Sequence, residues 1–410
     1  MQKKPWERRL KDLAHLLNSC AATYFDPELF RLNLNQFLQT SRTVTFIIQK
    51  NKKDIKDFEE WYSKSVIDRW AADPIMTWAK DSRNIIEKQG DLEMFSEAKA
   101  TLIFSYVERQ DIDLSTKNEM LGIGVKRLVR LAQKSLPSGV SDAAVIKSER
   151  RWVANTLREY ELLHALTIIY SRVYDCCKSL SLWIKHPLDN NIVKPAEFDL
   201  LRNETRRVTF LKLKNLSTGI ISIDNLSYSS SALSEITKDK IRSIYKPPSF
   251  KSIYDLVEHM AMIAEINFLR DGTHVQSLFL ISDSYEIIDL ISTKFEDQAD
   301  KYIFWRYAAE RAKMLNAYGF VWVSELWLRR PKKDYSEAIH KMPIIGEQLQ
   351  LVGVDCHNNQ KNVTWNIVRD SADSMPKLIL LPSEEKKEGR AYFMRSLLQA
   401  IGADVSMLNE

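Results

Sequence analysis

The sequence predicts an α+β protein in which an N-terminal helical bundle precedes a C-terminal α+β domain with a mainly antiparallel sheet. Apolar residues in the first half recur at steps of three and four, which is typical of helices. In the second half, helical segments alternate with short apolar runs bounded by turn residues. Because 410 residues exceed one ordinary domain, two are predicted. The predicted boundaries are 1–230, a linker at 231–250, and 251–410.

Four helices with short connections are predicted in the first 90 residues. Asp26-Pro27 and Asp73-Pro74 each open a helix, because Asp caps a helix and Pro suits its first turn. Gly90 is suited to end the fourth helix. The predicted ranges are 6–19, 27–50, 55–70 and 73–90. Their inward-facing aromatic residues indicate a bundle.

The rest of the first domain is predicted to mix strands with helices. A long helix from Ser141 to Leu182 is indicated by Leu163, Leu166 and Tyr170, which follow helical spacing. The other predicted elements are a strand at 101–107, a basic helix at 125–134 and a terminal hairpin with strands at 207–214 and 220–228. Serines at 229–231 and prolines at 247–248 mark the linker.

The second domain is predicted to pack helices on antiparallel strands. Its clearest hairpin turns at His357–Lys361. Helices are predicted at 252–269, 295–317 and 389–401. Strands are predicted at 275–281, 320–328, 348–355, 363–368 and 378–381.

Composition narrows the classes of protein that the chain could belong to. The formal net charge is +5, with 59 basic and 54 acidic residues, which permits a phosphate-binding patch without the strong basic excess of many nucleic-acid-binding domains. Four cysteines without a Cys-x-x-Cys pair make a zinc site or a disulfide framework unexpected. No signal peptide and no apolar run of about 20 residues is seen, so a cytoplasmic protein without membrane association is predicted.

A short motif near the end of the fourth predicted helix is the most specific feature. Arg83-Asn84 is followed after three residues by Lys88. This arrangement, late in a helical bundle, resembles the HEPN superfamily of RNA-binding and RNA-cleaving proteins over about the first 180 residues. The resemblance implies an RNA-associated protein of phage defence or a toxin–antitoxin system, with RNA as partner and a homodimer formed through the helical domain. No cofactor and no metal are implied.

The motif departs from the family at one position, because Lys88 stands where the family has His. A lysine with an ordinary pKa of about 10.4 stays protonated and is a poor general base. Arg83 would hold a phosphate, Asn84 would orient it and Lys88 would add charge, so the protein is predicted to bind RNA rather than cleave it. Whether it is an enzyme is left open. Arg83 and Glu87 are also spaced as an ordinary helical ion pair.

The second domain offers two further candidates. A basic run of Arg329, Arg330, Lys332 and Lys333 follows an aromatic strand and is predicted to contact RNA, with a solvated loop as the alternative. Glu325 shares a strand face with apolar neighbours, so it is either a functional carboxylate or the partner of a structural cation such as Arg369 or Arg270.

Several families of catalytic site are disfavoured. The sequence has no His-Glu-x-x-His spacing, no Gly-x-Gly-x-x-Gly, no P-loop and no Gly-x-Ser-x-Gly. Nucleotide-driven and serine-hydrolase chemistry are therefore not expected. The alternative to RNA binding is a non-enzymatic dimerisation or interaction protein with no nucleic-acid role.

Overall fold

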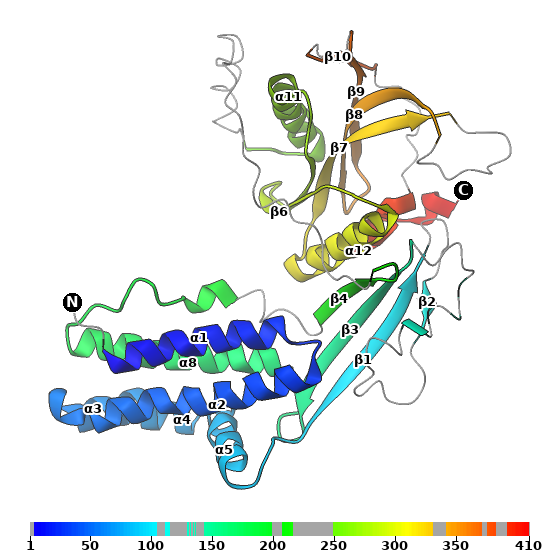
Figure 1. Cartoon of the computed structure of the whole chain (residues 1–410). Helices are drawn as coiled ribbons and strands as arrows, with labels where there is room; N and C mark the ends of the chain where they lie inside the picture. Colours follow the sequence, from blue (N-terminus) through cyan, green and yellow to red (C-terminus); the bar gives the residue numbers. More distant parts are fainter. Residues whose placement is uncertain are drawn as a thin grey trace. The chain divides into compact units, whose positions relative to one another are not determined.

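The computed structural model confirms the α+β class, and the chain divides into two compact units (Figure 1). The helical unit comprises residues 1–102, 111–141 and 146–213, and the sheet unit comprises 103–110, 142–145 and 214–410. The structure describes residues 4–104, 111–114, 129–130, 132, 134, 136, 143–198, 207–215, 249–330, 342–370, 375–382 and 392–409.

Four long helices form the body of the helical unit. They are α1 (Pro5–Ala22), α2 (Pro27–Lys50), α5 (Pro74–Lys88) and α8 (Leu162–Trp183). Between α2 and α5 the chain forms α3 (Phe58–Tyr62), a π-helical turn (Ser63–Ile67) and α4 (Asp68–Ala71). Both predicted caps are confirmed, since Asp26 accepts from Leu29 N and Asp73 accepts from Ile75 N.

A four-stranded sheet completes the helical unit, in the order β2-β1-β3-β4. The strands are β1 (Met94–Ile103), β2 (Ile112–Asp113), β3 (Val145–Ala154) and β4 (Arg207–Lys212). The helix predicted from Ser141 was wrong in its first part, because the chain forms β3 there and α8 begins only at Leu162. Val145, Ile146 and Val153 are β-branched and pack well in a strand, whereas the charged residues between them hide its alternation.

The sheet unit is built on six strands in the order β10-β9-β8-β7-β5-β6, with antiparallel pairing throughout (Figure 1). The strands are β5 (Gln276–Ile281), β6 (Ile287–Thr293), β7 (Gly319–Arg329), β8 (Ile344–Asp355), β9 (Gln360–Val368) and β10 (Lys377–Leu380). Its helices are α11 (Ile253–Asp271), α12 (Gln298–Leu315) and α13 (Arg395–Ala400).

Helices cover both faces of this sheet. The register places Leu278 beside Trp322 and Trp322 beside Val352, and these residues pack with α12 and α13. On the opposite face, Val323 and Leu351 pack with α11. Because successive strand residues point to opposite faces, each of these strands supplies both cores.

Some predictions fall outside what the structure tests. The predicted hairpin strand at 220–228 and the linker at 231–250 lie outside the described residues, apart from 249 and 250. The exact domain boundaries therefore stay a prediction.

Strand β6 was not predicted, because Ile287 and Leu290 are both 52% exposed and its sequence lacks a clear alternation. Among the helices that the structure describes, none combines the length and apolar character needed to cross a bilayer.

Close contact between α11 and the sheet requires a glycine at position 353. A Cβ there would lie 2.2 Å from Val257 Cγ2 and 3.2 Å from Ile253 Cδ1, both on α11. On the same strand, a Cβ at Gly346 would meet Leu328 Cδ1 at 3.5 Å, which is ordinary van der Waals contact.

We expect Gly353→Ala to lower the free energy of unfolding by about 1–3 kcal/mol, because the added methyl group overpacks the α11 contact. Gly346→Ala is the matched control and should change it by no more than about 0.5 kcal/mol. Urea unfolding of both variants measures the difference. If both variants changed the free energy of unfolding by the same amount, α11 would be able to move and accept the methyl group at no extra cost.

Candidate functional site

A pocket of about 720 Å³ opens in the helical unit where α1 begins. It is lined by Lys4, Pro5, Glu7, Arg8, Arg9, Lys11, Ile47 and Asp189. Ile47 comes from the end of α2, and Asp189 from the segment that follows α8. The volume lies within the range of small-molecule binding sites.

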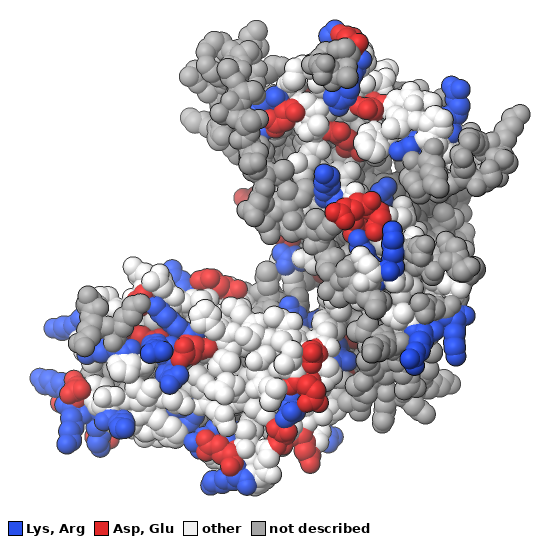
Figure 2. Space-filling view, viewed as in Figure 1, with Lys and Arg blue, Asp and Glu red and all other residues white. Residues whose placement is uncertain are grey.

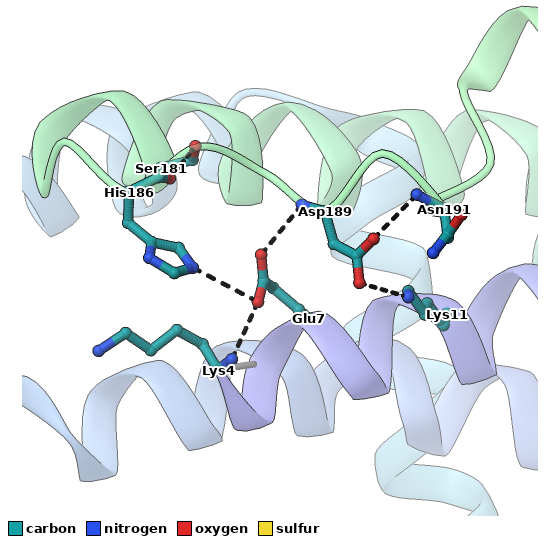
Figure 3. A network of polar contacts seen from close by, with 7 residues as sticks. All are labelled: Lys4, Glu7, Lys11, Ser181, His186, Asp189 and Asn191. Atoms are coloured by element: carbon teal, nitrogen blue, oxygen red, sulfur yellow. Dashed lines mark hydrogen bonds and ion pairs between the residues drawn. The ribbon is translucent and has the colours of Figure 1, made fainter. Parts of the chain in front are cut away.

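Glu7 is the buried carboxylate of this pocket and is only 2% exposed. Its Oε2 accepts from Lys4 N at 2.9 Å and lies 3.6 Å from His186 Nε2, and its Oε1 accepts from Asp189 N at 3.2 Å (Figure 3). Glu7 is the third residue of α1, where the positive end of the helix dipole favours a negative charge. The carboxylate thus ties the start of α1 to the segment after α8.

Asp189 extends the same network. Its Oδ2 accepts from Lys11 Nζ at 2.6 Å, and its Oδ1 accepts from Asn191 N at 2.9 Å (Figure 3). The segment is also held at its beginning, where Ser181 Oγ donates to His186 O at 2.6 Å. Both carboxylates that line the pocket are therefore committed to donors of the protein itself.

The cations of the pocket are only partly neutralised. Arg9 pairs with Asp12 at 2.9 Å, and Lys11 pairs with Asp189. Within the part of the chain that the structure describes, the side chains of Lys4 and Arg8 have no anionic partner, and Lys4 extends away from Glu7 (Figure 3). Figure 2 shows further basic side chains at this end of the helical unit. The pocket therefore has an excess of positive charge.

The predicted RNA site on α5 is a surface cluster in the structure. Arg83 Nη2 lies 2.7 Å from Glu87 Oε1, and Arg83 Nη1 donates to Asn84 Oδ1 at 3.1 Å. The guanidinium also stands 5.5 Å from the ring centroid of Phe46. Lys88, the last residue of α5, is exposed and makes no contact with this cluster among the described interactions. The structure thus joins Arg83 and Asn84 but does not bring Lys88 to them, and it does not test their predicted roles.

The predicted basic run is only partly described. Arg329 ends β7, donates to Met342 O and stands 5.8 Å from the ring of Trp327, which is 60% exposed. The backbone of Arg330 donates to Pro343 O at 3.2 Å. Lys332 and Lys333 lie outside the described residues, and an RNA contact by this run is untested.

Glu325 lies on the α11 face of the sheet and accepts from His274 N. The cations that were predicted as its partners bond elsewhere: Arg369 pairs with Glu347 at 3.0 Å, and Arg270 bonds to the carboxylate next to it in sequence. Burial raises the pKa of Glu325, aided by Glu347, although the His274 N–H and Arg369 oppose the shift. Burial also lowers the pKa of His274.

The residues of the pocket were not among the sites predicted from the sequence. Glu7 did carry a signal, because it stands three residues before Leu10 and seven before Ala14, on the buried stripe of its helix. His186 and Asp189 follow α8 in an irregular segment, where neither spacing nor composition marks them.

We expect Glu325→Gln to change how stability depends on pH. In the folded protein the pKa of Glu325 is raised above its ordinary value of 4.5. The folded state therefore holds this proton more tightly than the unfolded state does, and protonation of Glu325 stabilises the fold. This contribution is complete below the ordinary pKa and is lost as the pH rises through the raised one. Gln keeps an acceptor for His274 N and cannot ionise, so the variant should match the wild type near pH 4 and exceed it at pH 7.

Thermal unfolding midpoints between pH 4 and 8 measure this difference. The exposed Glu286, changed to Gln, is the matched control and should follow the wild type at every pH. A difference between Glu325→Gln and the wild type that does not vary with pH would contradict the titration of Glu325.

Arg83→Ala should lower the free energy of unfolding by about 0.5–1 kcal/mol, because it removes the Glu87 ion pair and the stacking on Phe46. Lys88→Ala, on the same helix, should leave it unchanged. Chemical denaturation of the two variants provides the comparison. An equal loss for both would show that the Arg83 contacts contribute no stability.

Comparison with known proteins places the chain in a family. The model of the family described as bacteriophage lambda protein ea47 matches residues 3–182 and 227–390. Protein ea47 of Escherichia phage lambda is 56% identical over 409 residues, and the alignment covers 100% of both chains. No solved structure matches the chain.

These matches correct the functional predictions. They show no relationship to the HEPN superfamily, so that resemblance was wrong, and the RNA-binding, phage-defence and toxin–antitoxin functions inferred from it are overturned. The alternative of a non-enzymatic dimerisation protein has no support either. The physical reason is that Arg, Asn and Lys on an exposed helix arise readily from ordinary surface pairing such as Arg83–Glu87. Both matches extend across the two units, and the chain belongs to the bacteriophage lambda protein ea47 family.

Proposed function

We propose that the helical unit binds a small anionic molecule in the pocket at the start of α1. The observation that carries the proposal is the imbalance of charge: Lys4 and Arg8 line the pocket without an anionic partner among the described residues, whereas Glu7 and Asp189 already accept hydrogen bonds. Cations gathered in a concave site raise the local concentration of anions.

The surroundings of the pocket support the same occupant. The dipole of the 18-residue α1 favours negative charge at this end. Pro5 and Ile47 offer apolar contacts to the rest of a ligand. A few polar groups beside apolar lining is the usual composition of a small-molecule site.

Each lining residue has a distinct role in this proposal. The planar guanidinium of Arg8 would donate hydrogen bonds to two oxygens of a carboxylate or phosphate. The ammonium of Lys4 would attract the same group as a point charge. Lys11 is held by Asp189 and adds charge at a defined position. Glu7 acts indirectly, because it fixes the segment that carries Asp189.

Calorimetric titration with inorganic phosphate, citrate and ATP at constant ionic strength tests the proposal. At least one of these anions should bind the wild type, and Lys4→Ala/Arg8→Ala should weaken that binding at least tenfold, because both unpaired charges are removed. The affinity of the wild type should also fall as salt is added.

The matched control is Lys52→Ala/Lys64→Ala, which removes two exposed cations that are already paired with Glu59 and Glu60 in the same unit. This control should bind as the wild type does. An equal loss in both double variants would assign the binding to overall charge and contradict a defined pocket, as would the absence of binding by all three anions.

A further inference from the structure

Strand β6 leaves one edge of the six-stranded sheet open. It is the last strand in the order β10-β9-β8-β7-β5-β6, at the opposite edge from β10 (Figure 1). Among the strands that the structure describes, β6 pairs with β5 alone. Its other side therefore carries backbone N–H and C=O groups that a further strand can use. A strand added to such an edge gains affinity from main-chain hydrogen bonds.

Apolar side chains are exposed along this edge. Ile287 and Leu290 are each 52% exposed, and Ile288 is 39% exposed. Proteins commonly protect an edge strand with lysine, proline or other charged residues. The sequence of β6 holds a single charged residue, Asp289, and Arg311 of α12 neutralises it at 2.8 Å. The edge thus lacks charged residues that would keep another strand away.

The apolar surface of β6 extends past the part of the sheet that α11 covers. The register places Leu290 beside Phe279 of β5, on the face that carries α11. Helix α11 packs mainly against β8, β9 and β10, at the other side of the sheet. A neighbouring strand at the β6 edge would bring its own side chains against Leu290 and remove apolar surface from water.

The charges that flank β6 favour a second copy of the same strand as its partner. Glu286 directly precedes the strand, Lys294 directly follows it, and both are exposed. Leu290 lies midway between them in the sequence. When two copies pair antiparallel about a two-fold axis at Leu290, Glu286 of each protomer comes to the same end as Lys294 of its partner. A parallel pair would bring like charges together at both ends.

A β-bulge in β6 is compatible with this arrangement. Leu280 pairs with Asp289 and Ile281 pairs with Ile287, so Ile288 is the extra residue. From Asp289 to Thr293 the pairing with β5 is continuous, and the centre of the antiparallel pair lies in this regular part. The bulge shifts the alignment at the ends by one residue, or about 3.3 Å, which a flexible lysine side chain can span.

We infer that two copies of the chain associate through β6 and join their sheets across a two-fold axis. The interface lies in the sheet unit, unlike the homodimer expected through the helical domain, and the inference does not rest on the proposed function. Because a single pair of strands buries a small area, the association is weak, with a dissociation constant of about 1–100 μM.

Sedimentation velocity of the full chain from about 1 to 200 μM tests the inference, since this range spans the expected dissociation constant. The wild type should change from the mass of one chain to that of two. Leu290→Lys should raise the dissociation constant at least tenfold, because it places two like charges at the axis. The matched control is Ile379→Lys on β10, the opposite edge of the sheet, where Ile379 is 54% exposed. This control should associate as the wild type does.

A charge exchange tests the antiparallel register with exposed residues alone. Glu286→Lys and Lys294→Glu should each weaken association about fivefold or more at low salt, because like charges then meet at both ends. An equimolar mixture of these two variants should associate as tightly as the wild type, since opposite charges meet at both ends of the mixed dimer.

Three results would overturn the inference. They are a wild type that keeps the mass of one chain at every concentration, a dimer that Leu290→Lys leaves intact, and a mixture of the two charge variants that associates no more tightly than either variant alone.

Discussion

Tyr24 lies in the turn between α1 and α2 and is fully buried. Its phenol connects the hairpin of α1 and α2 to β3 and to the start of α8. The hydroxyl donates to Glu161 at the start of α8 and accepts from Trp152 N on β3 at 3.1 Å. Burying these polar groups is tolerable only because each has a partner, and loss of one partner would leave the others unsatisfied. The packing of the helical hairpin against β3 and α8 therefore depends on this phenol.

The need of buried polar groups for hydrogen-bond partners also affects the carboxylates of the helical unit. A buried carboxylate stands near each end of α1: Glu7 at its start, and Glu161 beside the turn that follows it. Both accept backbone N–H groups, which stabilises helix ends and fixes irregular segments. Glu7 also lies 3.6 Å from His186 Nε2, and Glu161 also accepts from the Tyr24 hydroxyl. Arg8, near the start of α1, is left without an anionic partner among the described residues.

In the sheet unit, the central strands are apolar on both faces, because helices pack against both sides of the sheet. Residues such as Val321 and Trp322 are neighbours in sequence but belong to separate cores. Close packing on the α11 side then makes any side chain at position 353 costly. Where α11 ends, the polar contacts of Glu325 and Arg369 replace apolar packing and hold the chain that leads into β5.

Local features of the sequence determined the α+β class, helices α1, α2 and α5 and most strands of the sheet unit, because periodicity and caps such as Asp26 act over a few residues. Periodicity failed at β3, whose existence depends on pairing with strands far away in sequence. It failed also for the candidate site, since Glu7, His186 and Asp189 meet only after folding. The tertiary structure alone decided which charges far apart in the sequence are paired, as Lys11 and Asp189 are, because the fold and not the residue types sets the distance between them.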